Sequence, residues 1–346
     1  MRTTDLYLRG LGAFVPDAVP AASAVAEGLC PPEAPGRLDM TGAAVAGALS
    51  APEMALRASR EALARASMDP AELSLVLYAD TWHQGPEGWF PQSHLQHHLG
   101  TGDALALEIR QGCNALFAGL ELAAAHLAVR PAPGGALVVS SDNFGTPHMN
   151  RWTSNSSFMG DGACALVLAP GHGAVEVLSV NSMVVPELEE THRFGAPAFP
   201  PEATTDHGVV DFAAREAAFT RHLEETGAGT DLWMDVHKKM LKVVSRTMAE
   251  AGVTRADLAR AAFTSLGPED LEHRWLAVLD LPLSASTWDY GRRVGHIGAG
   301  DPFLGLRHLM DNKEVGPGDH VILGGLGSGV TVSCAVVRVL DPDDQG

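Results

Sequence analysis

The sequence of 346 residues predicts an α/β protein built from two similar halves. Alanine-rich helical patterns alternate with short β-branched runs, which is typical of an α/β architecture. The order of these elements over residues 105–170 recurs over residues 283–340. A repeat of about half the chain indicates a duplication and not a solenoid of short units. We therefore divide the chain into an N-terminal half, 1–172, and a C-terminal half, 173–346.

The first copy of the repeat surrounds a long amphipathic pattern. Leu116, Leu120 and Leu127 share one face of residues 114–130, which predicts a helix. The Pro- and Gly-rich residues 131–135 end it. In chain order, the expected elements are a strand at 105–109, the helix at 114–130, a strand at 136–142, and a turn with a strand at 158–170.

The second copy follows the same order. Pro302 suits the first turn of a helix, where its missing N–H group has no cost. The expected elements are a strand at 283–288, a helix at 302–312, a strand at 320–325, and a Gly-rich turn with a strand at 326–340.

Cys113 and His296 occupy near-equivalent positions in the two copies. Cys113 stands 22 residues before Gly135, and His296 stands 23 residues before Asp319. Two copies of a βα unit normally pack about a pseudo-twofold axis, so equivalent positions near that axis face each other. The duplication therefore predicts a thiol beside an imidazole.

Cys113 follows a predicted strand and opens a predicted helix. The free N–H groups and partial positive charge of a helix N-terminus stabilise a thiolate, which is a nucleophile. A buried apolar cysteine is the alternative for Cys113. Cys164 and Cys334 lie within strand patterns, where the buried structural role is favoured.

His296 lies in the stretch Gly-His-Ile-Gly-Ala-Gly-Asp, residues 295–301. Its imidazole could act as a base toward Cys113 or toward an acceptor. Asp301 could orient the imidazole and stabilise its cation, although an Asp before Pro is also an ordinary helix cap. Asp289 is an alternative orienting residue.

The bulk composition limits the partners and the compartment. A formal charge of −18 and a pI of about 5.2 argue against binding a nucleic-acid backbone. The sequence has no signal peptide pattern and no uninterrupted apolar run of about 18 residues, so we expect no membrane span. Its four cysteines show no CxxC pairing, which favours a reducing, cytoplasmic setting.

Two surface groups have both a functional and a structural interpretation. A local basic helix, expected over 237–248, either docks an acidic carrier protein or presents a solvated face. Its cations are Lys238, Lys239, Lys242 and Arg246. An aromatic cluster either lines a substrate pocket or packs at a surface or dimer contact. Its members are Trp82, His83, Trp89 and Phe90.

The stretch 184–230 is less regular and is rich in Pro, Glu and His. We interpret it as an insertion over the site, whose His192 and His207 could reach the chemistry. A separate trio, His94, His97 and His98, shares a helical face but lacks an acidic or Cys ligand at a diagnostic spacing. We therefore expect no metal site.

Three segments together resemble the thiolase superfamily, in particular its ketosynthase III branch, over nearly the whole chain. They are residues 109–123 around Cys113, residues 158–168, and the Gly-rich residues 321–339. The resemblance implies duplicated βαβαβαββ halves in a five-layered αβαβα arrangement, and a homodimer. It also implies that the N–H groups of Cys113 and Ser328 form an oxyanion hole.

The sequence departs from the condensing members of that family at two places. Those enzymes carry a His in a segment that matches Ser265–Gly267 here, where no His is present. They carry a Gly-Asn pair where this chain has Gly295-His296. The pattern is similar to a side branch of ketosynthase-like acyltransferases in antibiotic pathways, which use Cys, His and Asp to form esters or amides.

This resemblance implies a ping-pong acyl transfer without metal or redox cofactor. The donor would be an acyl thioester of acyl carrier protein or coenzyme A, and the acceptor a hydroxyl or amino group of a sugar, cyclitol or polyketide core. Two alternatives remain open. One is a ketosynthase III that primes polyketide synthesis by condensation, and the other is a non-catalytic scaffold.

Overall fold

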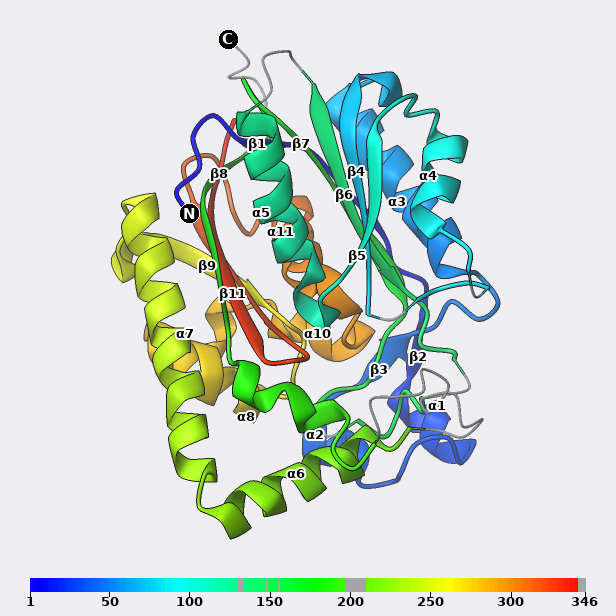
Figure 1. The fold of residues 1–346 in the computed structure, drawn as a ribbon, viewed down its shortest axis with the longest axis vertical. Helices are drawn as coiled ribbons and strands as arrows, with labels where there is room; N and C mark the ends of the chain where they lie inside the picture. Colours follow the sequence, from blue (N-terminus) through cyan, green and yellow to red (C-terminus); the bar gives the residue numbers. More distant parts are fainter. Residues whose placement is uncertain are drawn as a thin grey trace.

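The computed structural model in Figure 1 describes residues 1–81, 83–86, 88–129, 134–146, 149–154, 156–196 and 210–341. Within these residues, nine strands form one continuous mixed sheet in the order β5-β4-β6-β7-β1-β8-β11-β10-β9. A separate two-stranded sheet pairs β2 with β3.

The first half contributes the part of the large sheet from β5 to β1. Its strands are β1 (Tyr7–Phe14), β2 (Ala18–Pro20), β3 (Gly42–Ala44), β4 (Leu73–Asp80), β5 (Leu105–Arg110), β6 (Gly135–Asp142) and β7 (Gly162–Ala169). Its helices are α1 (Ala21–Ala26), α2 (Ala34–Leu38), α3 (Ala51–Ala66), α4 (Pro91–Leu99) and α5 (Ala115–Ala128).

The second half contributes the part from β8 to β9. Its strands are β8 (Val175–Val184), β9 (Leu258–Phe263), β10 (His320–Gly327) and β11 (Thr331–Val339). Its helices are α6 (Phe212–Thr226), α7 (Gly229–Ala251), α8 (Pro268–Leu271), α9 (Ala277–Leu279), α10 (Trp288–Val294) and α11 (Asp301–Asp311). Read outward from the middle, β8-β11-β10-β9 has the order of β1-β7-β6-β4 in the first half.

The elements stack in five layers, as the resemblance implied. Helix α3 packs on the outer face of the first half, where Met54 and Ala58 lie in one buried cluster with Val139. Helix α7 does the same for the second half, with Val243 against Val336. Helices α5 and α11 lie between the two halves of the sheet (Figure 1), and their apolar faces share the largest buried cluster.

The strand expected at 283–288 is wrong. Leu283–Ala285 form a 3₁₀ turn, and α10 begins at Trp288. Among the described residues, one parallel bridge, Ala261 to Ser286, is the strand pairing that this segment makes. The hydroxyl of Ser286 donates to Leu283 O at 2.7 Å, a local bond of the kind that competes with a sheet ladder.

The stretch 184–230 is more regular than its composition suggested. A 3₁₀ segment spans Pro186–His192, and α6 covers Phe212–Thr226. The Asp211 carboxylate caps α6 by accepting from Ala214 N at 2.8 Å, and Gly227 ends it in the left-handed region. The composition of the stretch did not reveal the helix, but these two capping residues mark its ends. The expected site residue His207 lies outside the described residues.

Candidate active site

Cys113 lies at the junction between β5 and α5. A 3₁₀ turn, Gly112–Asn114, separates the end of the strand from the first residue of the helix. Gly112 has a φ of +52°, and a Cβ there would lie 3.1 Å from the backbone N of Ser328. Glycine therefore permits the close approach of the Cys113 turn to the turn between β10 and β11.

Asn114 ties this turn to the second half of the molecule. Its fully buried side-chain amide donates to Thr331 O at 2.6 Å and to Ser333 Oγ at 3.1 Å. The two acceptors are on β11, next to the turn that carries Ser328. Sequence analysis missed Asn114, although an amide directly after a candidate nucleophile was a visible signal.

In the structure, the side chains of Cys113, His296 and Asp301 contact one another in succession. His296 Nε2 lies 2.8 Å from Cys113 Sγ, and His296 Nδ1 lies 2.5 Å from Asp301 Oδ2. His296 and Asp301 are each 5% exposed, whereas Cys113 is half-buried. The thiol therefore sits at the accessible end of a buried relay of hydrogen bonds.

Asp301 is aimed at the imidazole and not at the start of its own helix. Its Oδ1 accepts from Ile297 N at 2.7 Å, and its Oδ2 accepts from Ser265 N at 2.7 Å. Helix α11 has no side-chain cap. Asp289, the alternative orienting residue, is exposed on α10. The geometry therefore selects Asp301 over Asp289.

The His296 loop is held by main-chain contacts. His296 N donates to Phe158 O at 2.7 Å, and His296 O accepts from Gly160 N at 2.9 Å. Gly298 has a φ of +62°, and a Cβ there would lie 2.4 Å from Asp142 Oδ2. The glycines of the stretch 295–301 thus let the loop pack against the ends of the first-half strands.

The charges around His296 favour its protonated form. Burial opposes that charge, but Cys113 and Asp301 outweigh burial and raise the pKa of His296 well above its ordinary value. Burial raises the pKa of Asp142 to about 7, although the backbone and hydroxyl bonds from Thr81 oppose the shift. The other strand cysteines are inert by comparison, since burial raises the pKa of Cys334 to about 12 and that of Cys164 further.

Three members of the predicted aromatic cluster, His83, Trp89 and Phe90, lie in the described part of the chain. The His83 ring lies 3.2 Å from Glu108 Oε1 through Nδ1 and 3.0 Å from Pro86 O through Nε2. The Trp89 ring contacts His94, with 5.4 Å between centroids, and Phe90 is 60% exposed. Trp82 lies outside the described residues.

The remaining predicted residues that the structure describes lie on the 3₁₀ segment Pro186–His192 and on α7. His192 pairs with Glu216 at 3.0 Å. The basic residues lie on α7, as the sequence predicted. Lys238 and Lys242 are exposed, Lys239 donates to Val184 O at 2.8 Å, and Arg246 pairs with Glu250 at 2.9 Å.

The three histidines of α4 lie together, with ring centroids 4.2 Å apart for His94 and His98. Among the described residues, a different trio has the geometry to hold a metal ion, namely Asp80, His83 and Glu108. Sequence analysis singled out only His83 of these, because the two carboxylates come from different strands.

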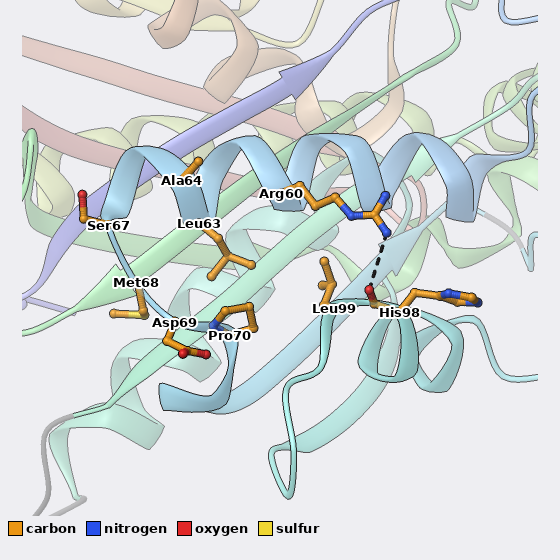
Figure 2. A pocket seen from close by; sticks show the side chains of 9 residues that line it. All are labelled: Arg60, Leu63, Ala64, Ser67, Met68, Asp69, Pro70, His98 and Leu99. Carbon is orange, nitrogen blue, oxygen red and sulfur yellow. Dashed lines mark hydrogen bonds between the residues drawn. The ribbon is translucent and has the colours of Figure 1, made fainter.

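Two surface hollows lie elsewhere. One, of about 360 Å³, is lined by α3 and by the end of α4, where Arg60 donates to His98 O (Figure 2). The other, of about 500 Å³, is lined by residues between Glu272 and Leu283. Neither contains Cys113 or His296, so we do not assign either to the acyl group.

Comparison with known proteins indicates the family of the chain. The family model for the C-terminal part of 3-oxoacyl-[acyl-carrier-protein] synthase III matches residues 248–339. The solved structure of ChlB3, an acyltransferase, has 47% identity, covers 98% of this chain and 99% of that chain, and has a TM-score of 0.92. The β-ketoacyl-[acyl-carrier-protein] synthase III of Streptomyces glaucescens is 26% identical over 83% of this chain and 81% of its own length. The synthase III structure from Pseudomonas aeruginosa PAO1 shares the fold at 21% identity, with a TM-score of 0.77 over 98% of this chain and 99% of that chain.

The chain belongs to the thiolase superfamily, as a ketosynthase III-like enzyme. It is an acyl-transferring enzyme, and its chemistry is thiolase-type acyl transfer or condensation. Within the described residues, no helix is long and apolar enough to cross a membrane.

Proposed function

We propose that this enzyme moves an acyl group from a carrier thioester, through Cys113, to a hydroxyl or amino group of a small secondary-metabolite acceptor. The sugar, cyclitol or polyketide core of an antibiotic is the class of acceptor we favour. The observation that carries the proposal is the contact of one base with the nucleophile, His296 Nε2 to Cys113 Sγ at 2.8 Å. The 47% identity to the ChlB3 acyltransferase supports it.

In the first half-reaction, His296 holds the proton of the Cys113 thiol as an imidazolium, and the thiolate attacks the thioester carbonyl. The raised pKa of His296 supports this ion pair. When the tetrahedral intermediate collapses, the carbon–sulfur bond to the donor breaks. His296 gives its proton to the departing thiol and becomes neutral.

In the second half-reaction, neutral His296 is a base. It takes the proton of the acceptor hydroxyl or amine, whose oxygen or nitrogen attacks the acyl-Cys113 carbonyl. Cys113 leaves as a thiolate beside the imidazolium, which restores the starting state. Asp301 stabilises the imidazolium throughout, because it lies 2.5 Å from Nδ1. No step requires a metal or redox cofactor.

The oxyanion of each tetrahedral intermediate is proposed to bind the N–H groups of Cys113 and Ser328. The approach of Gly112 to Ser328 N supports this pairing. Fixed main-chain donors stabilise such a charge at little cost of reorganisation, because they are already in place.

The segment at Ser265–Gly267 distinguishes this chemistry from condensation. In condensing relatives the matching segment supplies an imidazole, but here Ser265 supplies its backbone N–H to Asp301. Condensation remains the alternative function, because the curated relatives at 23–26% identity are mainly β-ketoacyl synthases.

We also propose an acyl carrier protein as the donor and a homodimer as the assembly. The exposed Lys238 and Lys242 on α7 offer an acidic carrier two cations. Strand β5 ends the large sheet, and its Leu105 and Leu107 are 53% and 43% exposed. An apolar edge strand of this kind favours pairing with a second copy of the chain.

The test is intact-protein mass spectrometry after mixing the enzyme with acyl and malonyl thioesters, each on carrier protein and on coenzyme A. We expect an acyl mass on wild type, none on Cys113→Ala, and release of the group to an added alcohol or amine. Carbon dioxide release with a lengthened acyl thioester would instead establish condensation. Full biological activity of Cys113→Ala would establish a scaffold role.

A further inference from the structure

We propose that Asp80, His83 and Glu108 form a binding site for a divalent cation of the zinc or manganese type. One ligand atom from each side chain lies within 4.8 Å of the other two. Asp80 is the last residue of β4, Glu108 lies on the neighbouring strand β5, and His83 follows β4 in the next segment. The proposed acyl transfer uses none of these three residues.

Asp80 is the first reason to place a cation here. Its side chain is fully buried, and neither of its carboxylate oxygens has a hydrogen-bond partner among the described residues. Its register neighbour on β5 is Arg110, which is exposed and acts on Asp80 through its charge, whereas the carboxylates of Asp142 and Glu108 repel Asp80. A buried carboxylate without a partner is costly, and a bound cation removes that cost.

His83 is the second reason, because its two ring nitrogens have different surroundings. Nε2 lies 3.0 Å from Pro86 O, which can only accept, so Nε2 carries the hydrogen. Nδ1 lies 3.2 Å from Glu108 Oε1, and an ion bound to both atoms would take the place of the proton between them. Metal-binding histidines show this arrangement, with one nitrogen on the ion and the other donating to a backbone carbonyl.

The ligand chemistry narrows the class of ion. One imidazole and two carboxylates suit zinc or another first-row transition ion, whereas magnesium and calcium favour oxygen ligands alone. An ion held by these three residues would cross-link the ends of β4 and β5 to the segment that follows Thr81. It would thereby stabilise the wall of the sheet next to Asp142, which packs against the His296 loop.

The test is titration of Zn²⁺, Mn²⁺ and Co²⁺ into chelator-treated protein by calorimetry. The parent for all variants is Cys113→Ala, because a thiolate beside His296 could itself bind a soft ion. We expect one ion per chain for Zn²⁺, and a Co²⁺ spectrum without a thiolate band. Asp80→Asn and Glu108→Gln should each weaken Zn²⁺ binding by about tenfold or more. His94→Ala, which removes a histidine of the α4 trio, should leave it unchanged.

Thermal unfolding separates an ion site from a purely structural cluster. Asp80→Asn keeps the shape of the side chain and removes one of the three ligands. We therefore expect it to melt no lower than the metal-free parent and to gain nothing from added Zn²⁺. The proposal is overturned if the parent binds none of the three ions saturably. It is also overturned if only His94→Ala weakens binding.

Discussion

The two halves of the molecule share a strand order but differ at one strand, and that difference separates the nucleophile from the base. In the first half, β5 is a complete strand that leads directly into the Cys113 turn and α5. In the second half, the equivalent place holds a 3₁₀ turn and the single Ala261–Ser286 bridge. The chain then has room for α10 and the glycine-rich loop that carries His296. In the described residues, the half without this strand is therefore the half that carries the base, His296.

The starts of the two central helices show the same division. At α5, the Cys113 thiol lies just before the helix N-terminus and 2.8 Å from His296 Nε2. At α11, the first residue is Asp301, whose carboxylate turns away from the helix to His296. The first half therefore carries the nucleophilic sulfur of Cys113. The second half carries the base, His296, and the carboxylate of Asp301 that stabilises the His296 cation.

The largest expected effect comes from removing the base of the second half while keeping the nucleophile of the first. In His296→Ala, Cys113 should still accept an acyl group, but more slowly. Transfer to the acceptor should fall by about 10²–10⁴-fold, because no group removes the acceptor proton. Single-turnover mass spectrometry measures both steps. Equal losses of rate in acylation and in transfer would contradict the separate roles of Cys113 and His296.

A smaller effect is expected for Asp301→Asn, with transfer reduced by roughly 10–10²-fold through loss of imidazole orientation and charge stabilisation. Asp301 helps to raise the pKa of His296. The stability that this raised pKa contributes is complete below the unfolded value of about 6.5. It is lost as the pH rises through the higher folded value.

In Asp301→Asn this loss should occur at lower pH, because the folded pKa of His296 falls. Melting temperatures measured from pH 6 upward test the shift. Asp289→Asn, at an exposed position on α10, is the matched control and should follow wild type. Identical curves of melting temperature against pH for wild type and Asp301→Asn would show that the Asp301 carboxylate does not help to raise the pKa of His296.

The contact between the halves at Gly298 can be tested through packing. In Gly298→Ala, the new methyl group would meet Asp142 Oδ2, and the backbone has a φ of +62°. We expect a loss of about 1–3 kcal/mol in the free energy of unfolding. Denaturant unfolding measures it. Gly316→Ala, where a Cβ would meet nothing within 4 Å, should change little.

The smallest effect is expected from charge reversal on an outer helix, measured as the KM for the acyl donor. Double charge reversal, Lys238→Glu with Lys242→Glu, should raise the KM for an acyl carrier substrate several-fold, because an acidic partner is repelled. The KM for the coenzyme A thioester should change less. Arg60→Glu on α3, the outer helix of the first half, is the control. Unchanged carrier kinetics in the α7 variant would exclude this face as the docking surface.

The duplication made much of the fold and the Cys113–His296 pairing predictable, because equivalent positions of a repeat meet across its axis. The failure of residues 283–288 to form the expected strand was not predictable, since local Ser286 bonds replace its ladder. Asn114 was missed, and Asp80, His83 and Glu108 were not recognised as a group, for another reason. Their importance comes from partners far away in the sequence, such as Thr331 on β11.

The bond from Ser265 N to Asp301 has a consequence for how this site can change over time. A main-chain donor is present whatever side chain residue 265 carries, proline excepted. Alanine in place of Ser265 would therefore keep this donor to Asp301. The alignment of the base thus depends on the path of the main chain at residue 265 and not on the serine hydroxyl, which packs against Gly291 of α10.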